Sequence, residues 1–446
     1  MSGEVTGCWR ARAVTLKDYE GIVGAKVIEE IMSLGERLRG RKVIHINSTR
    51  VGGGVAEILQ RLIPLLNESG MEAEWQVITG DEEFFHVTKS FHNALHGMRV
   101  AITNKMLESY IRNNEENAKL LDLDDADFVV IHDLQPAALI EHFPKRRGKW
   151  IWRCHIDVST PNPRVWEFLK HFISQYDAAV FHVEKFAKKD LLIRQFIIPP
   201  SIDPLSEKNR EIPSETVGMV LEKFHINHEK PVICQIGRFD HLKDPEGVVK
   251  VYQQVKRPDA VIDIQRLIRG GELLDATQLG KRGIDCQLIL AGGLAADDPE
   301  GQEVFRNVQK LVKGDRDAHI LLLPAGADLE INALQRASSV VLQKSLKEGF
   351  ALTVSEALWK GKPVIGGSAG GIPLQIINGV NGFLVNSIGE AAERARFLLK
   401  HPQKAREMGE VGREYVKRNF LITRHVRDYL MLYLTLELIP EKLVQV

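Results

Sequence analysis

The chain has 446 residues, more than one hydrophobic core usually organises, so we expect two domains of roughly 200 residues each. Lys plus Arg and Asp plus Glu are both 59, a balance that excludes a generally basic surface for nucleic acid or an acidic membrane. No C-x-x-C pair occurs among the four scattered cysteines, which argues against a structural zinc site or a disulfide framework: Cys8, Cys154, Cys234 and Cys286.

Short apolar runs alternate with amphipathic helical windows, which predicts an α/β protein with parallel sheets and helical crossovers. In the first half the expected strands are Lys42–Asn47, Trp75–Thr79, Phe128–His132, Trp150–His155 and Ala178–Val183. Residues 197–211, IIPPSIDPLSEKNRE, combine three prolines with a polar tail and are predicted to form a linker. We therefore expect a first domain over residues 1–205 and a second over residues 206–419.

Three glycines follow the first expected strand and precede a helical window over residues 55–67: Gly52, Gly53 and Gly54. Their amides can approach an anion or a sugar without an intervening side chain. The triplet is not the dinucleotide-binding fingerprint, because Glu57 stands where that pattern needs a glycine. A flexible turn is the alternative interpretation.

Polar side chains also stand at the ends of the third and fourth expected strands, where Asp133, His155 and Asp157 occur. Ligands of open parallel sheets bind at the carboxyl ends of the strands, so we predict that these residues face a binding site. For His155, a hydrogen-bonded histidine of the core is the competing interpretation.

In the second half the expected strands are Val232–Gly237, Gln287–Ala291, Ile320–Leu323, Val340–Gln343, Pro363–Gly366 and Gly382–Val385. Arg238 and Lys243 follow the first of them, in the loop GRFDHLKDPEG. Two fixed cations at a strand end can clamp a diphosphate and stabilise the charge that it gains on departure. A loop of surface ion pairs is the alternative.

The most informative segment is residues 347–363, KEGFALTVSEALWKGKP, in which Glu348 and Glu356 stand eight residues apart. The first carboxylate is expected in the loop before a helix and the second about two turns inside it. Between them, the amides around Leu352 and Thr353 would form a helix N-terminus, which favours an anionic group. Two solvated glutamates on a surface helix are the alternative.

The C-terminal residues 423–438 carry apolar side chains at three- and four-residue spacings, which predicts a helix with a broad buried face. The longest apolar stretch, residues 429–440, contains Glu437 and is too short to span a bilayer. Because the N-terminus has no apolar leader segment either, we expect a cytoplasmic protein without a membrane partner.

Together these elements resemble those of retaining glycosyltransferases of the two-Rossmann-domain (GT-B) type, the large family that includes sucrose and glycogen synthases. The resemblance covers the chain from about Val43 onward and rests on the strand-end His155, the loop with Arg238 and Lys243, the Glu348-x7-Glu356 motif, and residues 366–385, GGSAGGIPLQIINGVNGFLV. It implies two Rossmann-like domains that face each other across a cleft, with residues 420–446 crossing back onto the first domain.

Within this family the first half is most similar to trehalose synthases of the glycosyltransferring kind, which join a nucleotide-activated glucose to free glucose. The similar segments are INSTRVGGGVAEILQRLIPLLNESG, VVIHDLQPAALI and WRCHIDVSTPNP, together with LAADDPEG from the second half. Retaining trehalose phosphorylases share these segments. Residues 257–283 form a longer connection between a helix and a strand than the family pattern leads us to expect.

The resemblance implies a role for each site residue. Arg238 and Lys243 would hold the leaving diphosphate with the helix N-terminus at Leu352 and Thr353, Glu356 would bind a ribose, and Glu348 would orient the glucose hydroxyls. His155 would contact the donor sugar and support positive charge, while Gly53 and Gly54 would close over the leaving group. The acceptor would lie against Gly52, Asp133 and Asp157.

We therefore expect a retaining glucosyltransferase that makes trehalose reversibly from an NDP-glucose donor and free glucose. The alternatives are a retaining trehalose phosphorylase and, from a different class, a nucleotide-sugar epimerase with the same architecture. No cofactor is expected, and a divalent cation would be at most accessory, since Lys and Arg take its place. The expected partners are NDP-glucose and glucose or trehalose, with a homodimer allowed.

Overall fold

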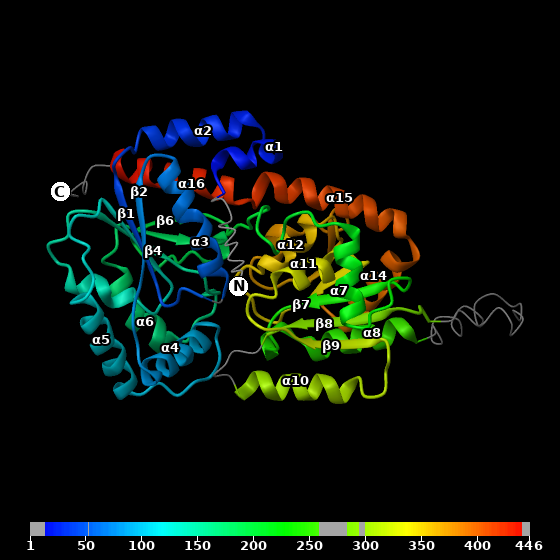
Figure 1. The fold of residues 1–446 in the computed structure, drawn as a ribbon. Helices are drawn as coiled ribbons and strands as arrows, with labels where there is room; N and C mark the ends of the chain where they lie inside the picture. The colour runs from blue at the N-terminus through cyan, green and yellow to red at the C-terminus, as the bar shows by residue number, and fades with distance from the viewer. Residues whose placement is uncertain (1–13, 52, 258–282, 294–298, 439–446) are drawn as a thin grey trace, which may run out of the picture.

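The structure, a computed structural model, describes residues 14–51, 53–257, 283–293 and 299–438. It consists of two lobes side by side, each built on one six-stranded sheet (Figure 1). Every strand pair in both sheets is parallel. The predicted α/β class with two Rossmann-like domains is therefore confirmed.

The first sheet has the strand order β2-β1-β3-β4-β5-β6. Its strands are β1 (Lys42–Asn47), β2 (Glu72–Val77), β3 (Phe128–His132), β4 (Lys149–Arg153), β5 (Ala178–Phe181) and β6 (Arg194–Ile197). Helical segments precede the first strand and connect the later ones: η1 (Leu16–Tyr19), α1 (Glu20–Val23), α2 (Ala25–Glu36), α3 (Gly53–Glu68), α4 (Glu82–Leu95), α5 (Asn104–Ala118), η2 (Ala137–His142), α6 (Pro163–Ile173) and η3 (Glu184–Phe186).

The second sheet has the order β12-β11-β10-β7-β8-β9. Its strands are β7 (Val232–Ile236), β8 (Gln287–Gly292), β9 (Ala318–Leu322), β10 (Val340–Gln343), β11 (Val364–Gly367) and β12 (Gly382–Val385). Around it lie α7 (Ser214–Lys223), η4 (His241–Lys243), α8 (Pro245–Lys256), α10 (Pro299–Leu311), α11 (Asp328–Ala337), α12 (Leu352–Trp359), α13 (Ile372–Gln375), α14 (Ile388–Lys400) and α15 (Pro402–Asn419), after which α16 (Ile422–Leu438) follows.

All eleven strands predicted from the sequence are present, most within two residues of the expected ends. The twelfth, β6, falls between the fifth predicted strand and the predicted linker and was missed. Central strands such as β3, β5, β7 and β10 are buried at every position, which explains their continuous apolar sequence. The unusually long connection at residues 257–283 lies almost entirely outside the described residues.

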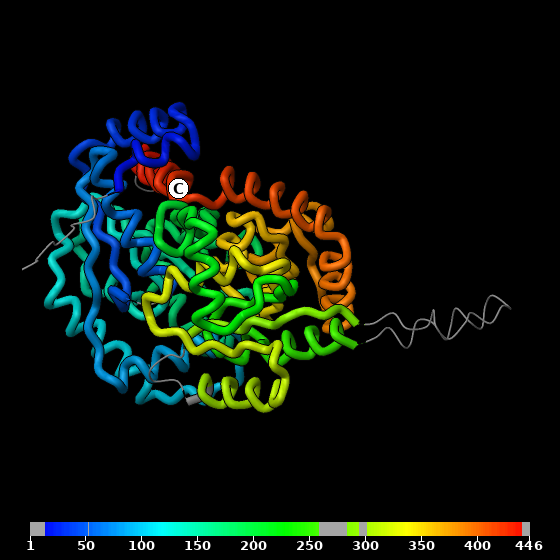
Figure 2. The backbone as a smooth tube through the Cα atoms, turned by 45° about the vertical axis from the view of Figure 1, so that its right-hand side comes forward, coloured from blue at the N-terminus to red at the C-terminus, as the bar shows by residue number. Residues whose placement is uncertain are grey.

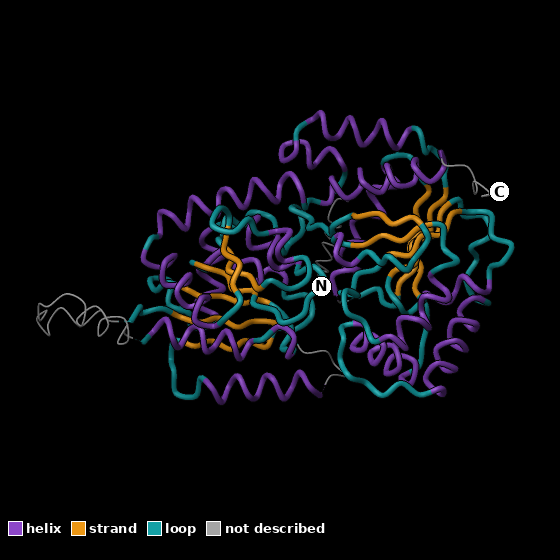
Figure 3. The backbone as a smooth tube through the Cα atoms, turned by 180° about the vertical axis from the view of Figure 1, so that it is seen from behind, coloured by secondary structure: helices purple, strands orange, loops and turns teal. Residues whose placement is uncertain are grey.

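Each sheet has an apolar core on both faces, so helices enclose the strands of both lobes (Figure 3). In the first lobe one core joins the sheet to α4, α5 and α6, and the other joins it to α2, α3 and α16. In the second lobe α7, α11 and α12 contribute to one core and α8, α10 and α14 to the other.

The C-terminal helix α16 packs in the core of the first lobe and lies against α2 from the opposite end of the sequence (Figures 1 and 2). The chain crosses between the lobes twice, and the two crossing segments are hydrogen-bonded to each other. Ile202 donates to the Phe420 carbonyl at 2.8 Å, and Ile422 donates to the Ile202 carbonyl at 2.9 Å. No helix in the described part of the chain combines the length and apolar character that crossing a bilayer requires.

Candidate active site

Contacts between the two lobes bring the carboxyl ends of both sheets together. A Cβ at Gly349, in the second lobe, would lie 2.4 Å from the carbonyl oxygen of His155 in the first. One at Gly54 would lie 2.8 Å from Leu352 Cδ1, again across the lobes. The glycine at Gly349 lets the two backbones approach closely, and the glycine at Gly54 leaves room for the Leu352 side chain. Residues predicted from separate halves of the sequence therefore face one another.

Lys243 and Glu348, predicted from separate motifs, form an ion pair. Lys243 Nζ lies 2.5 Å from Glu348 Oε2, and Ser345 donates to the same oxygen at 3.1 Å. The Glu348 residue is only 8% exposed. Lys243 comes from η4 after β7, and Glu348 from the loop after β10, the neighbouring strand. Adjacent parallel strands thus place one cation and one carboxylate at the same edge.

Arg238 follows β7 and is exposed. It lies near His92 of α4, in the other lobe. Burial is the main reason that the pKa of His92 falls to about 3, and the charge of Arg238 contributes to this lowering. Arg238 therefore lies close enough to the first lobe for its charge to act on His92, and it follows the same strand as Lys243.

Glu356 is 2% exposed and belongs to the second turn of α12. Gln335 donates to it at 3.4 Å, and Lys208 Nζ lies 3.7 Å from Glu356 Oε1. Lys208 also donates to Glu57 of α3 at 2.6 Å. Burial alone would lower the pKa of Lys208, but the two carboxylates raise it above its ordinary value. Glu356 and Glu57, from different lobes, thus share one linker cation.

Lys208 and Glu57 were not predicted as site residues. Lys208 lies in the polar tail of the linker, and Glu57 was interpreted only as the residue that breaks the dinucleotide pattern. Burial raises the pKa of Glu57, Lys208 opposes that rise, and Glu356 adds to it. In the sequence each of these residues is recognisable only as a charged side chain. Its ion-pair partners are known only once the two lobes are placed against each other.

The N-terminus of α12 lies where the Glu348 loop meets the first lobe. Ala351 precedes the helix with φ 69°, a left-handed conformation, and Leu352 is its first residue. Thr353 donates from Oγ1 to Gln343 Oε1 at 3.1 Å, which ties the first turn to β10. Gly53 opens α3 on the facing side with φ 80°, whereas Gly52 lies outside the described residues.

His155 follows β4 and uses both ring nitrogens in hydrogen bonds to other histidines. Its Nε2 lies 2.8 Å from His132 Nδ1, and its Nδ1 lies 3.2 Å from His182 Nε2. The His155 amide donates to Asp133 Oδ1 at 2.6 Å. Burial raises the pKa of Asp133 to about 7, although the His155 amide opposes this. Asp133 is thus held against the backbone of His155.

Asp157 is buried, and its Oδ1 accepts from the amide and the hydroxyl of Ser159 at 2.9 and 2.5 Å. His96 directly follows α4 and was not predicted as a site residue. It is 7% exposed, and its Nδ1 has no hydrogen-bond partner among the described residues. Burial lowers the pKa of His96, whereas the carboxylates of Asp157 and Glu348 oppose this lowering. One carboxylate from each lobe thus acts on His96, whose Nδ1 keeps the capacity to form a hydrogen bond.

Among the described residues no cluster of His, Cys, Asp or Glu has the arrangement of a metal site. The charges that the structure gathers at the facing edges are instead Lys243, Arg238, Glu348, Glu356 and Lys208. Such a set can neutralise a diphosphate and hydrogen-bond sugar hydroxyls.

Family models match both halves of the chain. The model described as trehalose synthase, N-terminal domain, matches residues 45–188, and the model of glycosyl transferases group 1 matches residues 220–415. The first range runs from within β1 to beyond β5, and the second contains β7 to β12.

Curated relatives match almost the whole chain. The trehalose synthase of Pyrococcus horikoshii is 45% identical over 418 residues, which cover 93% of this chain and 95% of the relative. That of Rubrobacter xylanophilus is 41% identical over 94% of this chain and 96% of its own. The trehalose phosphorylase of Pleurotus pulmonarius is 28% identical over 90% of this chain but only 58% of its own length.

Solved structures share the two-lobed fold. Sucrose-phosphate synthase from Thermosynechococcus elongatus has a TM-score of 0.68 at 18% identity, covering 89% of this chain and 99% of its own. The E. coli structure titled trehalose-6-phosphate bound with UDP-2-fluoro glucose has a TM-score of 0.66 at 14% identity, covering 90% and 100%. At these identities the likeness concerns the fold alone.

Proposed function

The chain belongs to the trehalose synthase family of retaining GT-B glycosyltransferases, and from this membership we infer that it transfers glucose from a nucleoside-diphosphate glucose to free glucose, making trehalose. The relatives named above are trehalose synthases at 41% and 45% identity over nearly their full length. The supporting observation in this chain is the Lys243–Glu348 pair, held at the carboxyl edge of the second sheet against the His155 end of the first.

The reaction breaks the bond between the anomeric carbon and the departing phosphate oxygen, whose electron pair leaves with the diphosphate. The acceptor hydroxyl oxygen bonds to that carbon from the same face, and its proton passes to the departing phosphate oxygen. Charge builds up on the diphosphate as the bond breaks, so Lys243 and Arg238 stabilise the transition state more than the ground state. No pair of carboxylates at glycosidase spacing is needed for this route.

The other site residues bind and orient the substrates. Glu348, fixed by Lys243 and Ser345, accepts hydrogen bonds from the donor glucose hydroxyls. Glu356 accepts from the ribose, in exchange for its distant contact with Lys208 at 3.7 Å. Asp157, with the glycine loop opposite, lies on the acceptor side. The amides at Leu352 and Thr353 face the diphosphate through the partial positive charge of the helix N-terminus.

We expect turnover to proceed without a divalent cation, because Lys243 and Arg238 supply the positive charge that such an ion would bring. Activity in a metal chelator should equal activity in added Mg²⁺. A chelated enzyme that is inactive and recovers with Mg²⁺ would contradict this part of the proposal.

The deciding experiment incubates the protein with labelled UDP-, ADP-, GDP- or TDP-glucose plus glucose and identifies the products. We expect labelled trehalose and a free nucleoside diphosphate, with the donor base read from the relative rates. Trehalose plus the preferred nucleoside diphosphate should regenerate the donor. Formation of glucose 1-phosphate from trehalose and inorganic phosphate would instead indicate a phosphorylase, and an altered monosaccharide would indicate an epimerase.

A further inference from the structure

Four histidines from the first sheet form one continuous hydrogen-bonded chain. His45 Nδ1 lies 2.9 Å from His132 Nε2, His132 Nδ1 lies 2.8 Å from His155 Nε2, and His155 Nδ1 lies 3.2 Å from His182 Nε2. At its inner end the chain reaches α16, where the Tyr433 hydroxyl lies 3.0 Å from His45 Nε2. Below, these four rings are called the histidine chain.

The strand order explains why these histidines meet. His45 lies in β1, His132 ends β3, and the other two follow β4 and β5, which are successive neighbours in the sheet. The chain therefore steps across the sheet from its middle toward the carboxyl edge. Consecutive ring centroids are each 5.2 Å apart, close to the spacing of adjacent strands.

The outer end of the histidine chain touches the loop that carries Glu348. His182 Cε1 lies 3.9 Å from the position that a Cβ on Gly349 would take, and the His182 ring packs against Phe350 at 6.0 Å between centroids. The carbonyl of His155 abuts Gly349 as well. A polar chain that begins inside the first lobe thus ends at the proposed donor site.

All four rings are neutral near pH 7. Burial lowers the pKa of His45 to about 3 and holds the pKa values of the other three well below their ordinary range. A neutral imidazole carries one proton, so it donates from one nitrogen and accepts at the other. Every link joins Nδ1 of one ring to Nε2 of the next, so all four rings must share the same tautomer.

Tyr433 decides which tautomer that is. Its hydroxyl is buried and has no other hydrogen bond among the described residues, so donating to His45 Nε2 is the arrangement that uses its proton. His45 then donates from Nδ1, as does each ring after it. The series of donors ends at His182 Nδ1, which has no hydrogen-bond partner among the described residues. The Gly349 backbone beside this ring opposes the lowering of the His182 pKa.

We propose that His132 is a positioning residue of the transferase, which donates from Nδ1 to His155 Nε2 and so holds the His155 ring in one orientation and one neutral tautomer beside the glycosyl donor. This proposal rests on the proposed function. Positive charge develops on the donor sugar as the diphosphate leaves, and an imidazolium beside it would oppose that charge. A fixed neutral ring avoids this repulsion and needs no reorganisation during the reaction.

Two replacements of His132 separate positioning from simple packing. In His132→Asn the amide nitrogen takes the place of Nδ1 and keeps the donor to His155, while the link to His45 is lost. His132→Leu loses both links. We expect the Leu variant to lower kcat about tenfold, the scale of one hydrogen bond of roughly 1.4 kcal/mol, and the Asn variant to stay within about threefold of the wild type. The KM for glucose should be unchanged in both.

A matched control is His319→Leu in the second lobe, where the His319 ring contacts Gln287 at 3.3 Å, away from the facing edges. It removes a hydrogen-bonded histidine of similar kind and should leave kcat unchanged. Equal losses of kcat in the Asn and Leu variants, at equal stability, would assign His132 a structural role and overturn the proposal.

A spectroscopic measurement tests the tautomer without relying on turnover. In protein labelled with ¹⁵N-histidine, long-range NMR spectra should show all four rings as neutral Nδ1–H tautomers, assigned by single replacements. His155 should keep that signature in His132→Asn and lose its single tautomer in His132→Leu. A folded Leu variant with an unchanged His155 signal and wild-type kcat would refute positioning. If the wild type made no trehalose while the NMR pattern held, the proposed function would fail instead.

Discussion

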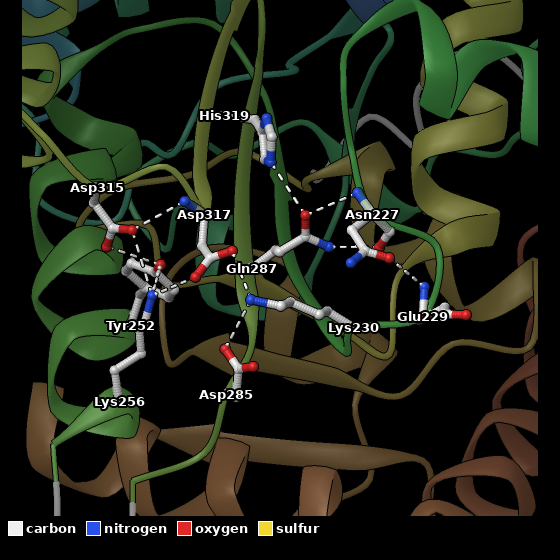
Figure 4. Close-up of polar contacts among 10 residues, drawn as sticks. All are labelled: Asn227, Glu229, Lys230, Tyr252, Lys256, Asp285, Gln287, Asp315, Asp317 and His319. Carbon is white, nitrogen blue, oxygen red and sulfur yellow. Dashed lines mark hydrogen bonds and ion pairs between the residues drawn. The ribbon is translucent and has the colours of Figure 1, made fainter.

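Two polar networks occupy opposite ends of the sheets and have opposite character. The first lies at the amino ends of β7, β8 and β9, where Lys230 contacts Asp285 and Asp317 at 3.1 and 3.0 Å (Figure 4). Lys256 contacts Asp317 at 2.9 Å and also donates to Asp315 and to the Tyr252 hydroxyl oxygen. Each ammonium group is thus satisfied by several oxygens, and the network is closed.

The second network lies at the facing carboxyl ends and is open. Lys243 has Glu348 as its carboxylate partner, Arg238 is exposed, and His96 Nδ1 has no partner among the described residues. By the number of ion pairs alone, the closed network would be the stronger candidate for a functional site. What distinguishes the open one is that its groups retain capacity to bind at the edge where parallel sheets take their ligands.

The largest expected effect comes from comparing a lysine of the open network with a lysine of the closed network. Lys243→Ala or Arg238→Ala should lower turnover at least about a hundredfold, because one preorganised charge-stabilising group is lost. Lys230→Ala is the matched control in the closed network and should keep wild-type turnover. Steady-state kinetics at saturating donor measure both. Near wild-type turnover in Lys243→Ala would remove that residue from the leaving-group site.

A smaller effect separates the two carboxylates within the open network. Glu348→Gln should depress kcat, because we propose that this group orients the reacting sugar. Glu356→Gln should mainly raise the donor KM, by about tenfold for a lost charge-assisted hydrogen bond, with kcat little changed. Inhibition by the nucleoside diphosphate should weaken only in the Glu356 variant. If both variants behaved alike, the division of roles would be wrong.

The strands of the fold followed from the sequence because central parallel strands are buried on both faces and read as continuous apolar runs. Strand β6, RQFI, was not predicted because it is a partly exposed edge strand that begins with two polar residues. Lys243 and Glu348 could be identified from the sequence as candidate site residues for a related reason. Each directly follows a recognisable strand, and the carboxyl ends of one sheet converge.

The residues that sequence reasoning missed depend on docking and strand order. Lys208 comes from the linker and gains its partners only when α3 approaches α12. His96 ends an ordinary amphipathic helix, and nothing in its local pattern marks it. The histidine chain joins residues 87, 23 and 27 positions apart, so it requires knowing that β1, β3, β4 and β5 are successive neighbours.

The dependence of stability on pH should have opposite signs for two carboxyl groups, Asp133 beside His155 and Asp317 in the closed network. Burial raises the pKa of Asp133 from 3.8 to about 7, so its folded form binds more protons than the unfolded chain between those values. Wild-type stability therefore falls as pH rises from about 4 to 7, and Asp133→Asn should gain relative stability across that window. Denaturant unfolding at several pH values measures the difference. A constant difference from pH 4 to 8 would contradict the raised pKa.

Asp317→Asn supplies the counterpart from the closed network. Burial alone would raise the pKa of Asp317, but hydrogen bonds from Lys256 and Lys230 lower it below its ordinary value. Its ionised form therefore stabilises the fold above about pH 4, and this contribution is lost as pH falls through the folded pKa. The Asn variant should be less stable than the wild type near neutral pH and approach it in acid.

The smallest effect concerns the ion pair between Lys256 and Asp317, which lie 2.9 Å apart with about a quarter of each side chain exposed, 28% and 25%. Solvent screens such a pair, so a double-mutant cycle of Lys256→Met and Asp317→Asn should give a coupling of about 0.2–1 kcal/mol in unfolding free energy. Raising the ionic strength should reduce it, because the Debye length shrinks to about 3 Å at 1 M salt. Neither variant should change kcat, since the amino ends of the strands lie away from the transferred sugar. A kinetic effect in this cycle would mean that the closed network communicates with the site, and the contrast between the two edges would no longer hold.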